Sequence, residues 1–283
     1  MSGLRYVEHR PRPELLLHVE CLWLASDPRA RPREPERAVP DGCPELIVHL
    51  RDRFARQHGG RFVVQPRAFL AGTLTRPWLL RAGRRVLTLG VRFRPGAVTA
   101  LLPVRMPEAT DRETGLAAIV GAAAARALSR ALRGARTEAA RFAAAESWLV
   151  ARLAQARPRG DGASAAVRLL IEARGAVRID DVARALSWSR RRLERTFARE
   201  LGIRPKLFAR IARLNAVLAG LGKGGRASAV DVALAAGYFD QAHLLRDFRG
   251  LAGRTPRASR DHDGELARHF TDPERLRLLF AGE

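Results

Sequence analysis

A pattern of five residues occurs twice in the C-terminal third of the chain, in the same order and with the same spacing. The pattern is Leu-x-Arg-x-Phe-x4-Gly-x2-Pro, and it runs from Leu193 to Pro205 and again from Leu244 to Pro256. Five matches in one register are improbable by chance, so one structural unit is expected to occur twice. In each copy the leucine and the phenylalanine are expected to be buried, with the arginine facing outward.

The residues around the first copy predict a helix-turn-helix. Asp180–Leu186 is expected to form a short helix, whose acidic N-terminus suits the helix dipole. Ser187–Ser189 forms the turn, and Ser189 can cap a second helix from about Arg190 to Leu201. This second helix is expected to turn four polar side chains outward: Arg190, Arg191, Glu194 and Arg195.

The residues before the second copy also predict the first half of a helix-turn-helix, a short helix and a turn. Ser228 or Asp231 starts the short helix, and Ala233 is small enough for another helix to cross above it. Gly237 makes the turn, where a positive φ is often needed. The second helix then spans about Asp240 to Arg249. Its expected outward residues are Gln241, Ala242, His243 and Arg246.

Between the two copies, Pro205–Leu221 carries a single apolar helical stripe. A helix there would hold the two units at a fixed separation, which suits entry into successive major grooves on one face of a DNA duplex. The alternative is a plain helical bundle in which the repeat serves packing alone.

The charge of the chain points to a polyanionic partner. The formal net charge is +22, and all but two of the basic residues are arginine. Arginine-rich composition typical of a GC-rich genome accounts for part of this excess, so its distribution is more informative than its total. Residues 164–260 hold 20 Lys+Arg against 8 Asp+Glu, a balance of +12 in about a third of the chain. This segment is the candidate for nucleic-acid binding.

Residues 164–260 resemble the DNA-binding domain of the AraC/XylS family of transcription regulators. The residues that carry the resemblance are SWSRRRLERTFARELGIRP (187–205) and, more specifically, DVALAAGYFDQAHLLRDFRGLAGRTP (231–256). It implies seven helices, a long linking helix and two recognition helices in adjacent major grooves. It also places the DNA-contacting surface on the outward residues of both units. Two departures are Ser187, where the first turn usually has glycine, and Leu244-Leu245, where Leu245 is expected to weaken a contact to the DNA backbone.

The outward side chains offer several kinds of DNA contact. Arg195 and Arg246, the matched pair of the repeat, are expected at the DNA surface, bonding either guanine O6 and N7 or phosphates. Glu194 could accept from cytosine N4 or form a salt bridge to a neighbouring arginine of its helix. Ala242 can offer apolar contact, for example to a thymine methyl. His243 could bond DNA or the backbone at the start of its own helix.

The first hundred residues contain short apolar runs separated by Gly, Pro and Arg-Gly punctuation, which predict strands. The runs are Glu45–Leu50, Arg61–Gln65, Ala68–Leu74, Trp78–Arg81 and Arg85–Phe93. Asp27–Pro40 is expected to be a loop, and Leu116–Leu132 and Glu138–Leu153 have helical spacing. The fold class is therefore α+β: a small antiparallel sheet or barrel (a cupin-like form being one option) with helices, followed by an all-α domain.

The front half also resembles, less specifically, an uncharacterised sensor-type domain found ahead of such DNA-binding domains in bacteria. The segments involved are 40–46, 71–72 and 90–96. Side chains that could line an effector pocket are His49, Arg67, Trp78 and Arg92, with Trp23 and Arg94 as further candidates. Core packing is the alternative for the tryptophans, and nothing in the sequence identifies the effector.

These observations divide the chain into a sensor or dimerisation domain at 1–155, a linker at 156–163, the DNA-binding domain at 164–260 and a tail at 261–283. The expected partners are double-stranded DNA, a small-molecule effector and a second copy of the chain, paired through the helical stretch 113–155. RNA polymerase is a further candidate partner. No cofactor, metal or membrane is expected.

Two alternatives come from other classes. Asp41, Cys43, Glu45 and His49 lie close in sequence and could form a thiol or metal site, including a DNA-repair chemistry that uses a reactive cysteine. A nucleoid protein without sequence preference is the other alternative. Two cysteines provide neither a disulfide framework nor a C-x-x-C spacing. Because signal-peptide and membrane-spanning patterns are lacking, a cytoplasmic protein is expected, associated with the nucleoid when bound to DNA.

Overall fold

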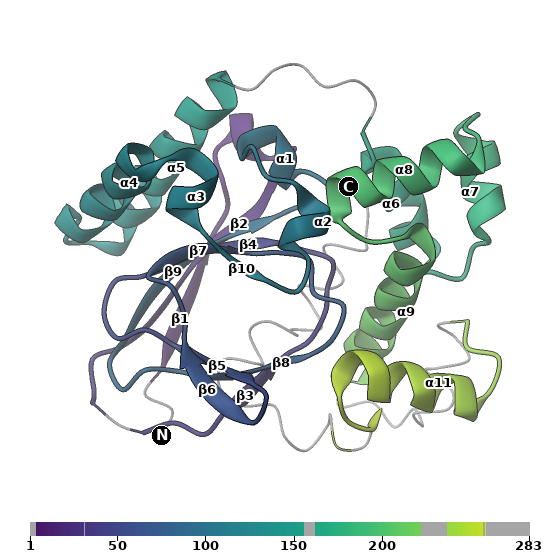
Figure 1. Ribbon diagram of the computed structural model, residues 1–283, viewed down its shortest axis with the longest axis horizontal. Coiled ribbons are helices and arrows are strands. Elements are labelled where there is room, and N and C mark those ends of the chain that lie inside the picture. The colour runs from purple at the N-terminus through teal and green to yellow at the C-terminus, as the bar shows by residue number, and fades with distance from the viewer. Residues whose placement is uncertain (1–3, 31, 156–161, 222–236, 257, 259–283) are drawn as a thin grey trace.

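The computed structural model describes residues 4–30, 32–155, 162–221, 237–256 and 258. Residues 4–155 form an N-terminal domain of two antiparallel sheets and several helices, and the described residues from 162 onward form a helical C-terminal domain packed beside it (Figure 1). The expected α+β class is therefore confirmed. None of the helices in the described part of the chain is long and apolar enough to cross a membrane.

The larger sheet has six strands in the order β1-β2-β9-β4-β7-β10. These strands are β1 (Arg5–His9), β2 (Val19–Asp27), β9 (Val86–Phe93), β4 (Glu45–His49), β7 (Ala68–Ala71) and β10 (Glu113–Gly115). The smaller sheet has the order β3-β8-β5-β6. Its strands are β3 (Glu36–Ala38), β8 (Trp78–Arg81), β5 (Ala55–His58) and β6 (Arg61–Val64). The described strands do not close into a barrel, so the open sheet, not the cupin-like barrel, is the correct one of the two expected forms.

All five expected strands are present, as β4, β6, β7, β8 and β9. The expected loop at Asp27–Pro40 is wrong in one respect, because Glu36–Ala38 pairs with β8. The central strand β2 was not expected. Its residues alternate between two cores, Leu22 and Leu24 packing on one side and Trp23 and Ala25 on the other, which is the period of a strand covered on both faces.

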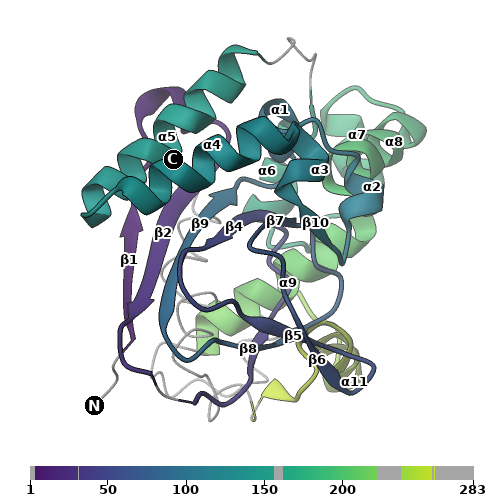
Figure 2. The ribbon, with the colours of Figure 1, turned by 60° about the vertical axis from the view of Figure 1, so that its left-hand side comes forward.

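The two faces of the larger sheet have different covers. One face packs against α3 (Leu116–Val120), α4 (Ala122–Gly134) and α5 (Glu138–Ala154), and the other faces the smaller sheet (Figure 2). The single helix expected over 116–132 is broken in two, because Gly121 has φ 83 between α3 and α4. Short turns η1 (Pro13–Leu15), α1 (Val98–Leu101) and α2 (Met106–Ala109) complete the domain.

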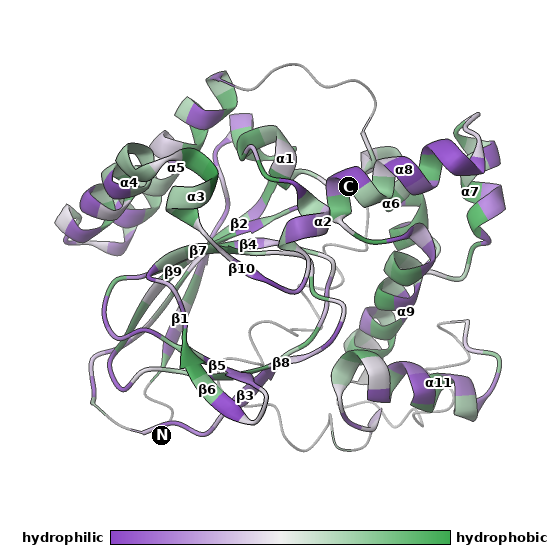
Figure 3. Cartoon of the chain, in the orientation of Figure 1, coloured by the Kyte–Doolittle hydropathy of each residue, from purple (hydrophilic) through white to green (hydrophobic). Residues whose placement is uncertain are grey.

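The C-terminal domain contains α6 (Ser164–Glu172), α7 (Ile179–Ala185), α8 (Arg190–Leu201), α9 (Pro205–Leu221) and α11 (Gln241–Asp247), which continues as the π-helical turn η2 (Phe248–Ala252). The expected bounds of α8 and α9 are confirmed. Hydrophobic residues dominate α9, whereas α8 is largely hydrophilic (Figure 3). The predicted linker, the first helix of the second unit with Ser228, Asp231 and Ala233, and the tail lie wholly or mostly outside the described residues.

Gly90 makes a testable contribution to the N-terminal core. Trp23 lies directly over it, so a Cβ at this position would be 2.0 Å from the Trp23 ring. We expect Gly90→Ala to lower the free energy of unfolding by about 1–3 kcal/mol through overpacking. Chemical denaturation measures this. Gly115→Ala is the matched control, since a Cβ there would meet nothing within 4 Å, and an equal loss in both variants would contradict the assignment.

Candidate DNA-binding interface and internal cavity

The first helix-turn-helix forms as expected from local chemistry. The Ser189 hydroxyl accepts from the Arg192 backbone N–H at 3.1 Å and caps α8. Gly202 ends the helix in the left-handed conformation at φ 75. Leu193 and Phe197 are fully buried. Ser187, noted above in place of the usual glycine, has φ 53, a conformation that carries a steric cost for residues other than glycine.

The four outward residues of α8 are all exposed, but they differ in their partners. Arg190 bonds Asp180 at 2.9 Å and Glu194 at 3.2 Å. Two contacts were expected for Glu194, a cytosine N4 or a neighbouring arginine, and the structure shows the salt bridge to the arginine. Arg191 and Arg195 have no ion pair or hydrogen bond within the described residues. Their guanidinium groups are available to a ligand outside the chain.

The second unit repeats this local design. Asp240 caps α11 by accepting from the His243 N–H at 2.6 Å, and Gly237 has φ 79 in the preceding turn. Gln241 and Ala242 are exposed, and so is Arg246, which also lacks an ion pair within the described residues. The His243 ring is half-buried and meets the Tyr238 ring edge-on at 5.0 Å.

Three residues missed at the sequence level fix the position of α11. Asp247 is buried and accepts from Arg210 of α9 at 2.8 Å. The Tyr238 hydroxyl donates to the other carboxylate oxygen at 3.3 Å. The repeat could have pointed to Asp247, because it aligns Asp247 with Thr196 of the first unit. Thr196 is also buried. This ion pair ties the second recognition helix to the linking helix.

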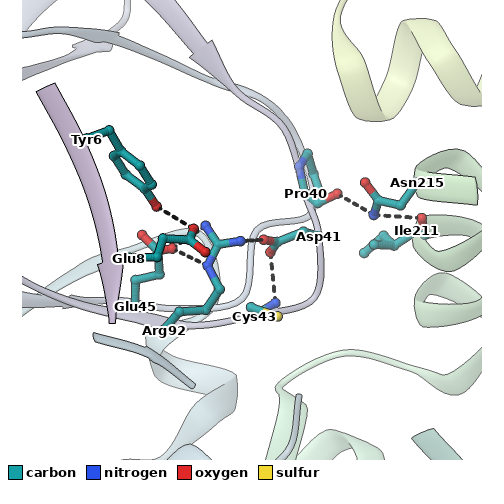
Figure 4. A network of polar contacts seen from close by, with 9 residues as sticks. All are labelled: Tyr6, Glu8, Pro40, Asp41, Cys43, Glu45, Arg92, Ile211 and Asn215. Atoms are coloured by element: carbon teal, nitrogen blue, oxygen red, sulfur yellow. Dashed lines mark hydrogen bonds and ion pairs between the residues drawn. The ribbon is translucent and has the colours of Figure 1, made fainter. Parts of the chain in front are cut away.

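The two domains meet along α9 at the segment 40–43 (Figure 4). The side-chain amide of Asn215 donates to the Pro40 carbonyl at 3.0 Å and to the Ile211 carbonyl at 2.9 Å. Gly42 has φ 86, and a Cβ there would be 2.7 Å from the Phe208 ring. Close backbone approach therefore requires glycine at this position. We call this contact the seam.

Both helix-turn-helix units also touch the N-terminal domain outside the seam. The Thr110 hydroxyl, after α2, donates to the Gly202 carbonyl at the end of α8, at 3.2 Å. Near the end of η2, a Cβ at Gly253 would be 2.9 Å from Pro77. The N-terminal domain thus contacts the first unit, the linking helix and the second unit.

Segment 40–43 is held on its other side by a buried cation. Arg92 is 1% exposed, and its guanidinium bonds Asp41 at 2.9 Å and Glu45 at 2.7 Å (Figure 4). Asp41 also accepts from the Cys43 N–H at 2.9 Å. Burial raises the pKa of Glu45 above its usual range, although Arg92 opposes that shift.

An internal cavity of about 80 Å³ opens beside Arg92, lined by residues of both sheets. Of the effector candidates, Trp23, His49, Trp78 and Arg92 line it. The other two lie elsewhere, since Arg67 donates to the His49 and Arg51 carbonyls and Arg94 pairs with Glu20.

His49 belongs to a hydrogen-bonded chain at the cavity wall. Its Nε2 donates to Gln65 at 3.2 Å, so its Nδ1 accepts from the Thr88 hydroxyl at 3.0 Å. Gln65 in turn donates to Glu113 at 3.0 Å. Burial lowers the pKa of His49 from 6.5 to about 4, which leaves the ring uncharged at neutral pH.

The thiols do not have the environment of a reactive cysteine. Cys21 and Cys43 are both buried, and burial raises the pKa of each thiol. A nucleophilic cysteine needs a lowered pKa. In the described part of the chain, no three His, Cys, Asp or Glu side chains gather as a metal site.

Two family models match the chain. A domain of unknown function, DUF6597, matches residues 7–115, and a helix-turn-helix domain matches residues 182–262. The second match spans most of the two repeat-related units whose capped helices are described above. The match at residues 182–262 identifies the C-terminal domain as an AraC-type helix-turn-helix domain. This domain supports a DNA-binding transcription regulator.

Solved structures similar to this regulator include ToxT from Vibrio cholerae O395, at 9% identity and a TM-score of 0.44, with 100% of both chains covered. ToxT from Vibrio cholerae in its P21 form has 7% identity and a TM-score of 0.47, covering 99% of this chain and 100% of that one. The AraC-like transcriptional activator CuxR has 14% identity and a TM-score of 0.25, covering 75% and 85%. No curated protein matches the regulator's sequence significantly.

His49 should make the stability of this regulator depend on pH. An unfolded chain takes up a proton at about pH 6.5, whereas the folded protein resists protonation until about pH 4. Stability is therefore lost as the pH falls through this window, by at most about 1.4 kcal/mol per pH unit from this group. Chemical denaturation at pH 7 and pH 5 measures this. Between these two pH values, His49→Gln should lose less free energy of unfolding than the unsubstituted protein. The exposed His58→Gln should keep the original slope, and a His49→Gln slope equal to the original would refute the assignment.

Proposed function

We propose that this regulator recognises an asymmetric duplex site of roughly two helical turns, with α8 and α11 in successive major grooves. The observation that carries the proposal is the pair Arg195 and Arg246. They are matched by the repeat, exposed and without an ion pair in the described chain. Their helices lie at opposite ends of α9 (Figure 1), whose 17 residues span about 25 Å at 1.5 Å per residue.

The individual contacts follow from side-chain chemistry. Arg195 and Arg246 suit guanine O6 and N7 or phosphate oxygens, and Gln241 suits adenine N6 and N7. Ala242 offers its methyl group to thymine. His243 is held against Tyr238, so we place it at the rim of the interface. Arg190 is shared by two carboxylates and is assigned a supporting role beside Arg191 and Glu194.

We further propose that the N-terminal domain senses a small molecule in the cavity lined by His49, Trp78 and Arg92, and that the seam passes occupancy on to the DNA-binding domain. Arg67 lies outside the cavity. It would contribute only by donating a hydrogen bond to the His49 carbonyl at the end of β4. A second copy of the chain would pair through 113–155, with RNA polymerase as a further partner at promoters in the cytoplasm. The proposed boundaries are 1–155, 156–163, 164–260 and 261–283.

Alanine substitution at the matched arginines tests sequence recognition. Arg195→Ala and Arg246→Ala should each weaken binding by about 1–3 kcal/mol if the arginine contacts a base, and relax specificity there. The two sites are far apart, so the double variant should show roughly the sum. Gel shifts on fragments selected from genomic DNA, with nonspecific competitor at physiological salt, measure these effects.

The matched control is Arg10→Ala, which removes the same charge from an exposed position just after β1 in the N-terminal domain. It should leave binding to the selected fragment nearly unchanged. Unchanged affinity in Arg195→Ala, Arg246→Ala and the double variant would overturn the assignment. Equal loss on selected and random DNA would reassign both arginines to phosphates.

Substitution at Gly42 tests the seam. Gly42→Ala should push the 40–43 segment away from Phe208 of α9 and lower DNA affinity by about tenfold, because α9, which carries both units, loses its fixed contact with the N-terminal domain. Gly60→Ala is the control: it has a similar φ of 83 but no atom within 4 Å of the added Cβ. Both variants carry the same backbone strain. Equal DNA affinity for both in gel shifts would show that the seam does not influence DNA binding.

A further inference from the structure

Phe239 is the most exposed large apolar side chain in the described part of the chain, at 90%. It lies directly before α11, and three exposed residues follow it without a break: Asp240, Gln241 and Ala242. Single apolar residues on a protein surface are ordinary. This one needs an explanation, because it adjoins the face that is proposed to read DNA.

The position of Phe239 is fixed by the residues on either side of it. Tyr238 is buried, and its hydroxyl donates to Asp247 at 3.3 Å. Asp240 caps α11 by accepting from the His243 N–H at 2.6 Å. Since both neighbours are held in this way, the exposure of the Phe239 ring belongs to the folded structure of the turn.

The repeat places Trp188 at the position of Phe239, 51 residues earlier and directly before the residue that caps α8. Trp188 is half-buried, packs against the C-terminal core and has the Arg192 guanidinium over its ring, 4.4 Å from the centre. The counterpart of Arg192 is His243, whose ring meets Tyr238 instead. The second unit therefore leaves its aromatic ring uncovered, since Phe239 has no ring or cation contact within the described residues.

The charges around Phe239 indicate what kind of partner covers it. Arg246 and Arg249 are exposed, whereas the nearby carboxylates are already engaged, Asp240 in the helix cap and Asp247 in the ion pair with α9. A partner has to combine negative charge with an apolar contact point. Duplex DNA offers both, because its phosphates are anionic and its major groove displays the C5-methyl group of thymine, on which phenylalanine can pack.

We propose that Phe239 is a specificity-determining residue that packs against the C5-methyl group of a thymine in the half-site read by α11. The N-terminal residues of a recognition helix are those that contact base edges, and Phe239 lies at that end of α11. The contact selects thymine without a hydrogen bond. The inference rests on the proposed function, because it takes α11 to lie in a major groove.

Deoxyuridine tests the contact on the unsubstituted full chain, because uracil lacks only the methyl group and pairs as thymine does. Gel shifts on the selected genomic fragment, with each thymine replaced in turn, should show one position where affinity falls about fourfold, the effect of one buried methyl group. This position should lie in the half-site whose protection from hydroxyl radicals is weakened by Arg246→Ala. No loss at any position there, or a half-site without thymine, would overturn the proposal.

Phe239→Ala combines the protein change with the DNA change. The variant should bind the thymine fragment at least about fourfold more weakly, and deoxyuridine at the identified position should weaken it no further. Leu17→Ala is the matched control, because it removes another exposed large apolar side chain, 81% exposed in the N-terminal domain. It should keep both the affinity and the deoxyuridine effect. A deoxyuridine effect that persists in Phe239→Ala would overturn the proposal, because the methyl group would then contact another residue, such as Ala242.

Arg246→Ala separates failure of the thymine contact from failure of the proposed function. It should weaken binding while the deoxyuridine effect persists, since Phe239 is still present. Weaker binding in Arg246→Ala but not in Phe239→Ala would refute the thymine contact alone. Unchanged affinity in both variants would show that α11 does not contact DNA, which would refute the proposed function as well.

Discussion

Arg92 carries its charge inside the N-terminal domain, and the arrangement of both domains depends on how that charge is neutralised. Removing a guanidinium from water costs several kcal/mol unless carboxylates and hydrogen bonds compensate it. Glu45 comes from the adjacent strand β4, while Asp41 comes from the connecting segment before it. The ion pair with Asp41 therefore fixes an otherwise irregular segment. Pro40 and Gly42 in that segment form the seam with α9.

The linking helix consequently has two neighbours of different character. On one side it packs in the core of the C-terminal domain, and on the other Asn215, itself buried, bonds the backbone of the N-terminal domain. The helix that separates α8 from α11 is thus also the helix that the N-terminal domain contacts. Under the function proposed above, a change near Arg92 would have a short, contiguous route to the helix that sets the spacing of α8 and α11.

The two units are related by sequence but are supported differently. The first recognition helix has 12 residues and ends at Gly202 against α2. The second has 7 residues before it passes into a π-helical turn, and the Asp247–Arg210 ion pair secures it to α9. The repeat preserves the cap, the buried leucine and phenylalanine, and the exposed arginine. The asymmetry in anchoring suits two units with unequal parts in recognition.

Local patterns were enough to predict the bounds of α8 and α9, the Ser189 cap and the burial of Leu193 and Phe197, because short-range spacing and capping chemistry decide them. The same patterns missed β2, whose residues are buried on both faces and so lack a polar alternation, and placed one helix where Gly121 breaks it. They also selected Arg67 beside Arg92. Only pairing across the sheet shows that Arg92 points into the cavity and Arg67 does not.

By itself, the sequence determined that two related helical units exist, where α8 and α9 begin and end, and which arginines the units expose, since each depends on residues a few positions apart. Tertiary structure alone decided the seam, the cavity and the Asp247 anchor, because these join residues from distant parts of the chain. Pro40 meets Asn215, and Trp78 meets Arg56, only after the sheets have paired. No local propensity encodes such contacts, because they arise from how two sheets and a helix pack together.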